Sequence, residues 1–314
     1  MARVMTFNPL DWPQAFAQPR HLTGASTWMQ HIPFAFALVQ MSRPSVIVEL
    51  GVSRGDSYFA FCQAVDELKL PAQCVGIDTW QGDAHEGFYG GEVLARLRAF
   101  HDPAFGRFST LVQSTFDAAL PRFADGSIDV LHLDGFHTYE AVRHDFEAWR
   151  PKVSDRGVVL FHDTQERGRG FGVWQLWEEL AGRYPSFEFR HGHGLGVLAV
   201  GARAPEPVLA FVRTAVAEPE AARRYFETLG RHVELRGLLG VMLSNVQQQQ
   251  AMVNAWKQRA GIPIDPATQD PNATFGQPLL ALQRLARDVH GLIADDLQFR
   301  GARDAASNPT GGPS

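Results

Sequence analysis

The sequence predicts an α/β fold: a doubly wound, mostly parallel sheet of seven strands, followed by a C-terminal helical appendage. The main observation is that short apolar runs alternate with segments of helical periodicity between residues 46 and 183. A second observation is that two further apolar runs, separated by His-Gly-His-Gly, close this alternation as a hairpin. The 314-residue chain is 45% hydrophobic and 20% charged, which is the composition of a protein with a substantial core.

Each predicted element rests on its local pattern. Residues 25–42 favour two helical pieces, the second of which begins or kinks at Pro33, because the proline ring fixes φ. Apolar and β-branched runs predict strands at 46–50, 74–78, 108–112, 128–133, 157–161, 187–190 and 195–200. Apolar residues at spacings of three and four predict helices at 55–69, 91–101, 115–122, 138–149 and 172–183.

The composition changes after residue 201. Residues 206–231 predict two short helices. Residues 235–256 predict a longer one, whose apolar stripe either packs on its own domain or supports self-association as a coiled coil. Prolines predict a linker over 261–278, before an amphipathic helix over 279–297. The expected domains are an N-terminal helical segment (1–44), the sheet domain (45–203), a helical appendage able to oligomerise (204–304) and a disordered tail (305–314).

Charge and composition exclude several classes of protein. The 29 Lys+Arg and 34 Asp+Glu residues leave a net charge of −5, which argues against a basic nucleic-acid-binding face. Two cysteines cannot build a disulfide framework or a four-thiolate zinc site. The first residues have no apolar run of the secretory type, and no run approaches the ~18 apolar residues of a membrane helix. We therefore expect a cytoplasmic protein with no nucleic-acid partner and no transmembrane segment.

A glycine loop follows the first predicted strand, at the sheet edge where doubly wound folds bind ligands. Gly51 and Gly55 allow a tight turn and a close ligand, whereas Ser53 replaces the middle glycine of a dinucleotide fingerprint. Asp78 ends the second strand and is placed either to bind ribose hydroxyls or to cap a turn. Glu49 beside the loop suits a cationic ligand. S-adenosylmethionine (SAM), with a ribose, an amino group and a sulfonium, fits this pattern better than NAD.

Carboxylates and histidines follow the fourth and fifth predicted strands. Asp134 ends one strand, and His162 and Asp163 end its neighbour, so the three side chains are expected to converge. Two carboxylates and an imidazole are a plausible ligand set for a divalent cation. His137 is then placed to take a proton from a hydroxyl held on that cation. Without a metal, His137 and Asp134 could still act as a base dyad in which Asp134 orients the imidazole. The alternative is that these residues are ordinary turn and packing residues.

A glycine-rich segment over 83–91 follows Asp78 and predicts a flap over the site. His85 and Tyr89 in this flap are candidates for substrate contact, or else parts of a structural loop. Trp80 either lines the cofactor pocket or packs in the core.

Four motifs together resemble a known family. They are Glu-Leu-Gly-x-x-x-Gly at 49–55, Ile-Asp-Thr-Trp-x-Gly-Asp-x-His-x-Gly-x-Tyr-Gly at 77–90, Leu-Asp-Gly-x-His-x-Tyr-Glu at 133–140 and His-Asp-Thr at 162–164. Over residues 45–201 the chain resembles class I SAM-dependent methyltransferases, which have a Rossmann-like sheet. More narrowly, it is similar to a bacterial family often attached to glycosyltransferases, whose relatives include macrolide-sugar O-methyltransferases.

The resemblance implies a role for each matching residue. The amino acid end of SAM would be held by Glu49, Gly51, Ser53 and Gly55. Asp78 would bind the ribose, and Ser114 would lie near the adenine. Asp134 and Asp163 would be carboxylate ligands of a magnesium ion, with His137 as the base. The sequence departs from the family at His162, where those relatives carry a carboxylate, so manganese suits the site as well as magnesium.

The expected function is therefore a SAM-dependent O-methyltransferase that methylates a hydroxyl of a sugar or glycan, with or without a divalent metal. One alternative is a small-molecule phenol or catechol O-methyltransferase. Another is a SAM-binding scaffold that recruits a glycosyltransferase. The C-terminal helices are the expected contact for a second copy of the chain or for a glycosyltransferase partner.

Overall fold

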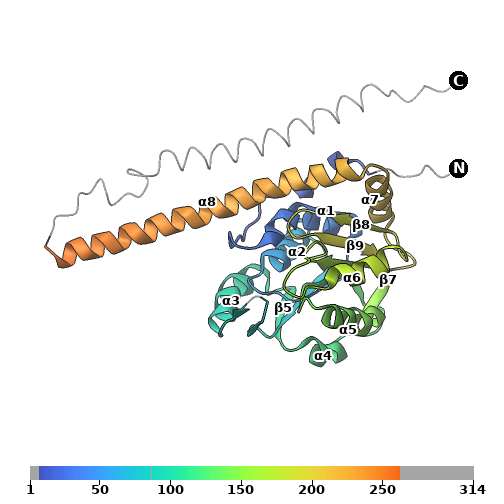
Figure 1. Cartoon of the computed structure of the whole chain (residues 1–314), viewed down its shortest axis with the longest axis horizontal. Helices are drawn as coiled ribbons and strands as arrows, with labels where there is room; N and C mark the ends of the chain where they lie inside the picture. The colour runs from blue at the N-terminus through green and yellow to red at the C-terminus, as the bar shows by residue number, and fades with distance from the viewer. Residues whose placement is uncertain (1–6, 86, 262–314) are drawn as a thin grey trace, which may run out of the picture. The chain divides into compact units, whose positions relative to one another are not determined.

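The computed structural model of the chain describes residues 7–85 and 87–261 (Figure 1). The chain divides into two compact units, one made of residues 1–22 and 26–230 and the other of residues 23–25 and 231–314. The first unit contains a seven-stranded sheet in the order β5-β2-β1-β6-β7-β9-β8. Helices lie on both faces of this sheet, which confirms the predicted doubly wound fold (Figure 1).

The strands of the sheet match the predicted series closely. They are β1 (Val46–Leu50), β2 (Gln73–Asp78), β5 (Ser109–Gln113), β6 (Ile128–Leu133), β7 (Val153–His162), β8 (Ser186–Phe189) and β9 (Leu195–Ala199). The first five pair in parallel, whereas β9 runs antiparallel to both β7 and β8. The strand β7 begins four residues before the predicted start, because Val153 already pairs with Ile128 across a register shift.

The helices of the first unit also follow the predicted order. They are α1 (Ile32–Ser42), α2 (Asp56–Glu67), α3 (Glu92–Phe105), α4 (Phe116–Ala119), α5 (Tyr139–Trp149), α6 (Val173–Ala181) and α7 (Glu206–Ala217). Short 3-10 turns lie at Pro9–Asp11, Pro13–Phe16, Thr27–His31, Leu120–Arg122 and Arg150–Lys152. Thr138 caps α5 by accepting a hydrogen bond from the Ala141 amide.

The alternation of side chains along β6 separates the two faces of the sheet. Leu131 and Leu133 belong to the apolar cluster formed with α5 and α6, which includes Phe146. His132, between them, lies on the opposite face, where its ring packs on Trp28. A polar residue is thus buried within the core on one face, while the residues that follow Leu133 emerge at the sheet edge.

Two parts of the chain differ from the sequence prediction. The glycine-rich flap contains a small hairpin, β3 (Gly82–Asp83) and β4 (Gly87–Phe88), which was not predicted. The second short helix expected before residue 231 is not separate from the helix expected at 235–256, and that expectation was wrong. Both are part of α8 (Pro219–Arg259), one helix of 41 residues, because no glycine–proline break interrupts the segment.

The part of α8 that belongs to the second unit carries exposed apolar side chains. Leu235, Met242 and Trp256 are each more than half exposed. Association through this face stays a prediction, as do the domain limits. The predicted helix at 279–297 and tail at 305–314 lie outside the described residues, and so does all but residue 261 of the predicted linker. Over the described ranges, no helix is both long enough and apolar enough to cross a membrane.

Candidate active site

The candidate site lies where the order of the sheet reverses, between β1 and β6. The Asp134 amide donates to the Leu50 carbonyl at 2.8 Å, so the loops that follow these two strands touch. Gly51 has φ +91°, and a Cβ added there would lie 1.9 Å from the Asp134 carbonyl oxygen. Only glycine permits this approach, which opens the crevice that doubly wound sheets use for ligands.

A cavity of about 250 Å³ occupies this crevice. Its walls come from the ends of β1, β2, β5 and β6 and from the flap. The lining residues are Gly51, Ser53, Asp78, Thr79, Gly82, Asp83, Tyr89, Thr115, Phe116, Asp134, Gly135, Phe136 and His137. The structure therefore brings together six of the residues predicted from the sequence: Gly51, Ser53, Asp78, Tyr89, Asp134 and His137. Sequence analysis did not single out Thr79, Asp83, Thr115 and Phe116 as site residues, although Thr79 and Asp83 belong to the motif at 77–90.

Asp78 holds the glycine loop in place. Its Oδ2 accepts the amides of Val52 and Ser53 at 2.9 and 2.8 Å, and its Oδ1 accepts the Trp80 amide at 2.6 Å. The loop is strained, since Ser53 and Trp80 both have positive φ. The carboxylate thus supports the turn, which is one of the two roles that the sequence left open. It also lines the cavity, and its binding of ribose stays a prediction.

Four predicted cofactor residues do not line this cavity. Glu49 is fully buried and pairs with His132 and Ser57. The indole of Trp80 is buried and donates to the Ser53 carbonyl at 3.1 Å. Gly55 begins α2 in a left-handed conformation, and the Ser114 hydroxyl donates to the Thr115 carbonyl. Their predicted contacts with SAM stay predictions.

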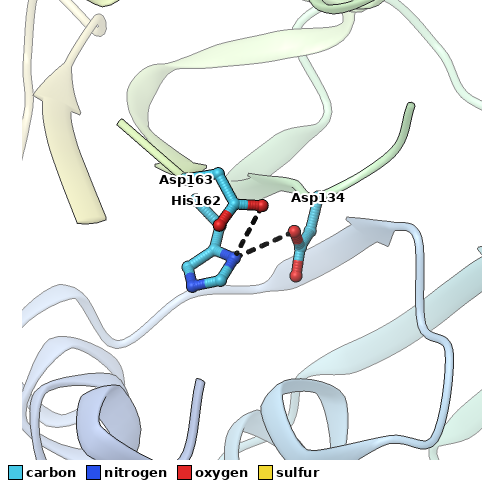
Figure 2. A group of neighbouring side chains, drawn as sticks. All are labelled: Asp134, His162 and Asp163. Carbon is cyan, nitrogen blue, oxygen red and sulfur yellow. Dashed lines mark hydrogen bonds and ion pairs between the residues drawn. The ribbon is translucent and has the colours of Figure 1, made fainter. Parts of the chain in front are cut away.

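Asp134, His162 and Asp163 do converge, as Figure 2 shows. The His162 Nδ1 lies 3.1 Å from an Asp134 oxygen and 3.5 Å from an Asp163 oxygen. One donor atom from each residue lies within 4.8 Å of the others, so the three could hold one metal ion. The register explains the encounter, because Leu133 pairs with Phe161 and the next residue of each strand therefore meets its neighbour.

The second nitrogen of His162 determines how the ring can be used. Nε2 lies 3.0 Å from the Gly192 carbonyl, which can only accept, so Nε2 carries the proton and Nδ1 faces the carboxylates. Burial tends to lower the pKa of His162, but Asp163 and Asp134 outweigh it and raise that pKa well above its ordinary value. Burial likewise opposes ionisation of the two acids, yet His162 holds the pKa of both Asp134 and Asp163 well below the usual range. These directions favour the ionised forms of the two carboxylates and of His162.

His137 completes the cluster from the loop after β6. Its Nε2 lies 3.0 Å from Asp163 Oδ2 and 3.5 Å from Asp134 Oδ1. The ring is buried, and within the described chain neither ring nitrogen makes a hydrogen bond of good geometry. The open hydrogen-bonding capacity of a buried imidazole, at the edge of the cavity, is the chemical feature of this site.

His193 is a member of this neighbourhood that sequence analysis treated as a turn residue. It does lie in the turn between β8 and β9, with φ +65°, but its Nδ1 is also 3.4 Å from Asp163 Oδ1. The glycines on either side of His193 allow that turn, and they were the sequence feature that could have indicated its position. His85 does not line the cavity; its ring stacks on Phe136 and Phe171. Tyr89 lines the cavity from the flap.

This geometry defines a doubly wound sheet with a small-molecule cavity and an acid–histidine cluster at its switch point. Residues 48–164 match the model of a family described as a methyltransferase domain. The match runs from β1 past Asp163, so it contains the glycine loop, the flap and the cluster. The match supports a methyltransferase domain in this part of the chain and, with it, the predicted use of SAM. It does not distinguish the narrower macrolide-sugar or glycosyltransferase-associated family.

The chain is also similar to individual proteins. The uncharacterized protein y4gI of Sinorhizobium fredii (strain NBRC 101917 / NGR234) is 50% identical over 198 residues, which are 63% of this chain and 22% of that protein. The chain thus spans about a fifth of the length of the curated relative it matches. The solved O-methyltransferase TomG from Streptomyces achromogenes, involved in tomaymycin synthesis and in complex with SAM, is 14% identical, with a TM-score of 0.43 over 64% of this chain and 92% of that chain. A putative caffeoyl-CoA O-methyltransferase from Staphylococcus aureus is 15% identical, with a TM-score of 0.42 over 53% of this chain and 80% of that chain.

Proposed function

We propose that the sheet domain is a SAM-dependent O-methyltransferase that methylates a hydroxyl group of a sugar or glycan. The observation that carries this proposal is His137, a buried imidazole with open hydrogen-bonding capacity beside two carboxylates at the cavity edge. Hydrogen bonds to a catalytic base often form only when the substrate is bound, so such an open nitrogen suits a base that receives a hydroxyl proton.

The cavity residues fit SAM. Gly51 lets the backbone approach a ligand closely, and Asp78 presents a carboxylate to the cavity. A carboxylate has about four acceptor positions, and backbone amides use three of those of Asp78, which leaves room for about one ribose hydroxyl. When bound, SAM supplies an electrophilic methyl group on its sulfonium.

The residues of the chain then provide orientation and proton transfer. The acceptor oxygen bonds to the methyl carbon as the carbon–sulfur bond breaks, and the electron pair of that bond stays on sulfur. The hydroxyl proton passes to a ring nitrogen of His137, and the charged Asp134 and Asp163 stabilise the imidazolium that forms. The acceptor must be held with its oxygen about 3 Å from the methyl carbon.

We also propose that Asp134, His162 and Asp163 bind a divalent cation. The donor set fits, because the Gly192 carbonyl holds the proton on Nε2 and a cation that displaces the proton on Nδ1 would gain that nitrogen as a ligand. Two carboxylates and one imidazole suit manganese as well as magnesium. A bound cation would lower the pKa of the acceptor hydroxyl.

The acceptor class is supported by the rim of the cavity. Phe136, which is 37% exposed, and Tyr89 both line the cavity, so two aromatic side chains contribute to its wall. Such a rim suits a hydroxylated ring, and a neutral acceptor does not require a basic surface. The same ring faces would also stack on a phenol or catechol, which is the second candidate acceptor. A cytoplasmic location, and association with a second copy or a glycosyltransferase through α8, remain proposals.

The test is methyl transfer from radiolabelled SAM to free sugars, nucleotide-linked sugars, glycans and catechol. We expect the wild-type protein to methylate a sugar hydroxyl. His137→Gln should be slower by about 10²–10⁴-fold, with SAM affinity unchanged by calorimetry. If the protein methylates catechol and none of the sugars, the acceptor class is a phenol and not a sugar. Turnover of His137→Gln equal to that of the wild type would refute the role of His137 as the base. SAM binding without transfer to any acceptor would favour the scaffold.

A further inference from the structure

Four aromatic rings from three loops meet beside the cavity. His85 comes from the flap, Phe136 and His137 follow β6, and Phe171 follows β7. The His137 and Phe171 rings are nearly parallel, 8° apart, with centroids separated by 4.6 Å. The His85 ring stacks on Phe171 at 4.6 Å and 20° and on Phe136 at 4.6 Å and 23°. Both imidazoles therefore stack on Phe171.

The stack accounts for the orientation of His137. Its Nε2 lies 3.0 Å from Asp163, but neither ring nitrogen makes a hydrogen bond of good geometry within the described chain, so these contacts alone do not fix the ring plane. The backbone is held, because the Gly172 amide donates to the His137 carbonyl at 2.8 Å. This bond requires a glycine, since a Cβ on Gly172 would lie 2.5 Å from the Tyr139 nitrogen. The buried ring of Phe171, one residue earlier, then lies flat against the imidazole.

Stacking also accounts for the placement of His85. Its amide donates to the Asp83 carboxylate at 2.7 Å, whereas its buried Nδ1 has no hydrogen-bond partner among the described residues. The flap backbone is bent by Gly82, with φ +73°, where a Cβ would lie 2.0 Å from the Gly87 carbonyl oxygen. The flap residues Gly82, Asp83 and Tyr89 line the cavity, so a stacked His85 holds a wall of the cofactor site in place.

We propose that Phe171 is a positioning residue that orients the base His137 and at the same time seats the flap through His85. This inference rests on the proposed methyltransferase function. In this proposal His85 acts through its aromatic ring, which stacks on Phe171, and does not bind the substrate. The buried Phe171 ring thereby contacts both His85, in the flap that forms a wall of the cofactor cavity, and the base His137. The base has its productive orientation when the flap is held in place by the stack of His85 on Phe171.

The first test measures the release of S-adenosylhomocysteine, which needs no acceptor. The dissociation rate is measured by stopped flow for the wild type, His85→Ala and His85→Phe. We expect His85→Ala to release the ligand about three- to tenfold faster, the effect of one lost aromatic stack, and His85→Phe to retain the wild-type rate. Phe88→Ala is the matched control, because Phe88 lies on the same flap but is 81% exposed.

The second test separates positioning from packing at Phe171. Phe171→Leu should lower kcat for methyl transfer while leaving KM for the acceptor unchanged, and Phe171→Tyr, which keeps the ring, should restore kcat. A purely structural role would lower the melting temperature of Phe171→Leu without this split between kcat and KM.

The possible failures are distinguishable. If the wild-type protein does not bind S-adenosylhomocysteine, the proposed function is refuted and this inference with it. If the ligand binds but His85→Ala and the wild type release it at the same rate, only the link through Phe171 is refuted. Equal acceleration in His85→Phe and His85→Ala would also refute it, because the ring would then not matter.

Discussion

Two acid–histidine groups lie within the same sheet and differ in what they leave unsatisfied. In the first, Glu49 and His132 are completely buried, with 3.0 Å between a carboxylate oxygen and Nδ1. Ser57 donates to the other carboxylate oxygen at 2.6 Å, and the Trp28 indole donates to His132 Nε2 at 3.1 Å. Every polar atom of this group therefore has a partner inside the protein.

The second group begins two residues further along β6, with Asp134. Asp134 and His137 line the cavity, and neither ring nitrogen of His137 has a good hydrogen bond within the described chain. Burial raises the pKa of Glu49 despite its partners, whereas charged neighbours hold the pKa of Asp134 below its usual range although burial opposes this. Residue type therefore does not separate the two groups. The completeness of the hydrogen bonding separates them. We therefore propose a structural role for the first group and a catalytic role for the second.

The largest expected effect is the loss of stability on breaking the closed group. Glu49→Ala removes the partner of the buried His132 Nδ1 and of the buried Ser57 hydroxyl, and should lower the free energy of unfolding by about 3–5 kcal/mol. His137→Gln is the matched variant in the open group and should lower it by about 1 kcal/mol or less, because it loses no good hydrogen bond. Urea denaturation measures both. A stable Glu49→Ala that no longer binds SAM would overturn the assignment and favour the predicted cofactor contact of Glu49.

The next effect concerns the proposed metal. Manganese at 100 times its dissociation constant should stabilise the folded protein by about 2.7 kcal/mol, seen as a higher melting temperature. Asp163→Asn should abolish this shift. Arg167→Gln, in the loop after β7 but not among the grouped ligands, should retain it. The absence of any shift with manganese or magnesium in the wild type would argue against the site.

A smaller effect is expected at Asp78. Asp78→Asn replaces an oxygen that accepts a backbone amide by a donor, so the loop over 51–55 should loosen. We expect the affinity for S-adenosylhomocysteine to fall about tenfold, or about 1.4 kcal/mol, by calorimetry. Asp117→Asn, which alters an exposed pair with His144, serves as the control. Unchanged affinity in Asp78→Asn would remove this carboxylate from the cofactor site.

A last test applies the same principle to a third acid. Asp145 on α5 makes no hydrogen bond or ion pair that we find in the described chain, and burial raises its pKa to about 7. Because the pKa in unfolded chains is about 3.9, the folded protein binds this proton more tightly, and its contribution to stability is lost as pH rises from about 4 to about 7. Asp145→Asn should therefore raise the melting temperature more at pH 8 than at pH 5. The opposite order would show that Asp145 has a partner when ionised.

Local patterns predicted the central strands well. β1 and β6 match the prediction to the residue, because both consist mainly of apolar residues and are bounded by polar residues or glycine. The start of β7 was missed, because Ser154, Asp155 and Arg156 resemble a loop and join the strand only through pairing with β6. The flap hairpin was missed because a two-residue strand has no periodicity of its own.

For the site too, one part could be predicted from the sequence and another could not. Asp134, His162 and Asp163 could be brought together from the sequence, because strand ends in a parallel sheet share one edge. Phe171 and His193 could not, because they lie in loops whose paths depend on contacts with distant residues. The role of Glu49 also changed, since the partners that satisfy it, His132 and Ser57, come from β6 and α2.

The sequence by itself determined the order of strands and helices, the sheet edge that carries the chemistry and the types of residue gathered there. It could do so because periodicity and strand ends are properties of neighbouring residues along the chain. Only the tertiary structure decided which acid–histidine group is closed and which is open, and which ring lies against the base. Those features depend on whether side chains far apart in sequence meet at hydrogen-bonding or stacking distance, and no local pattern specifies such distances.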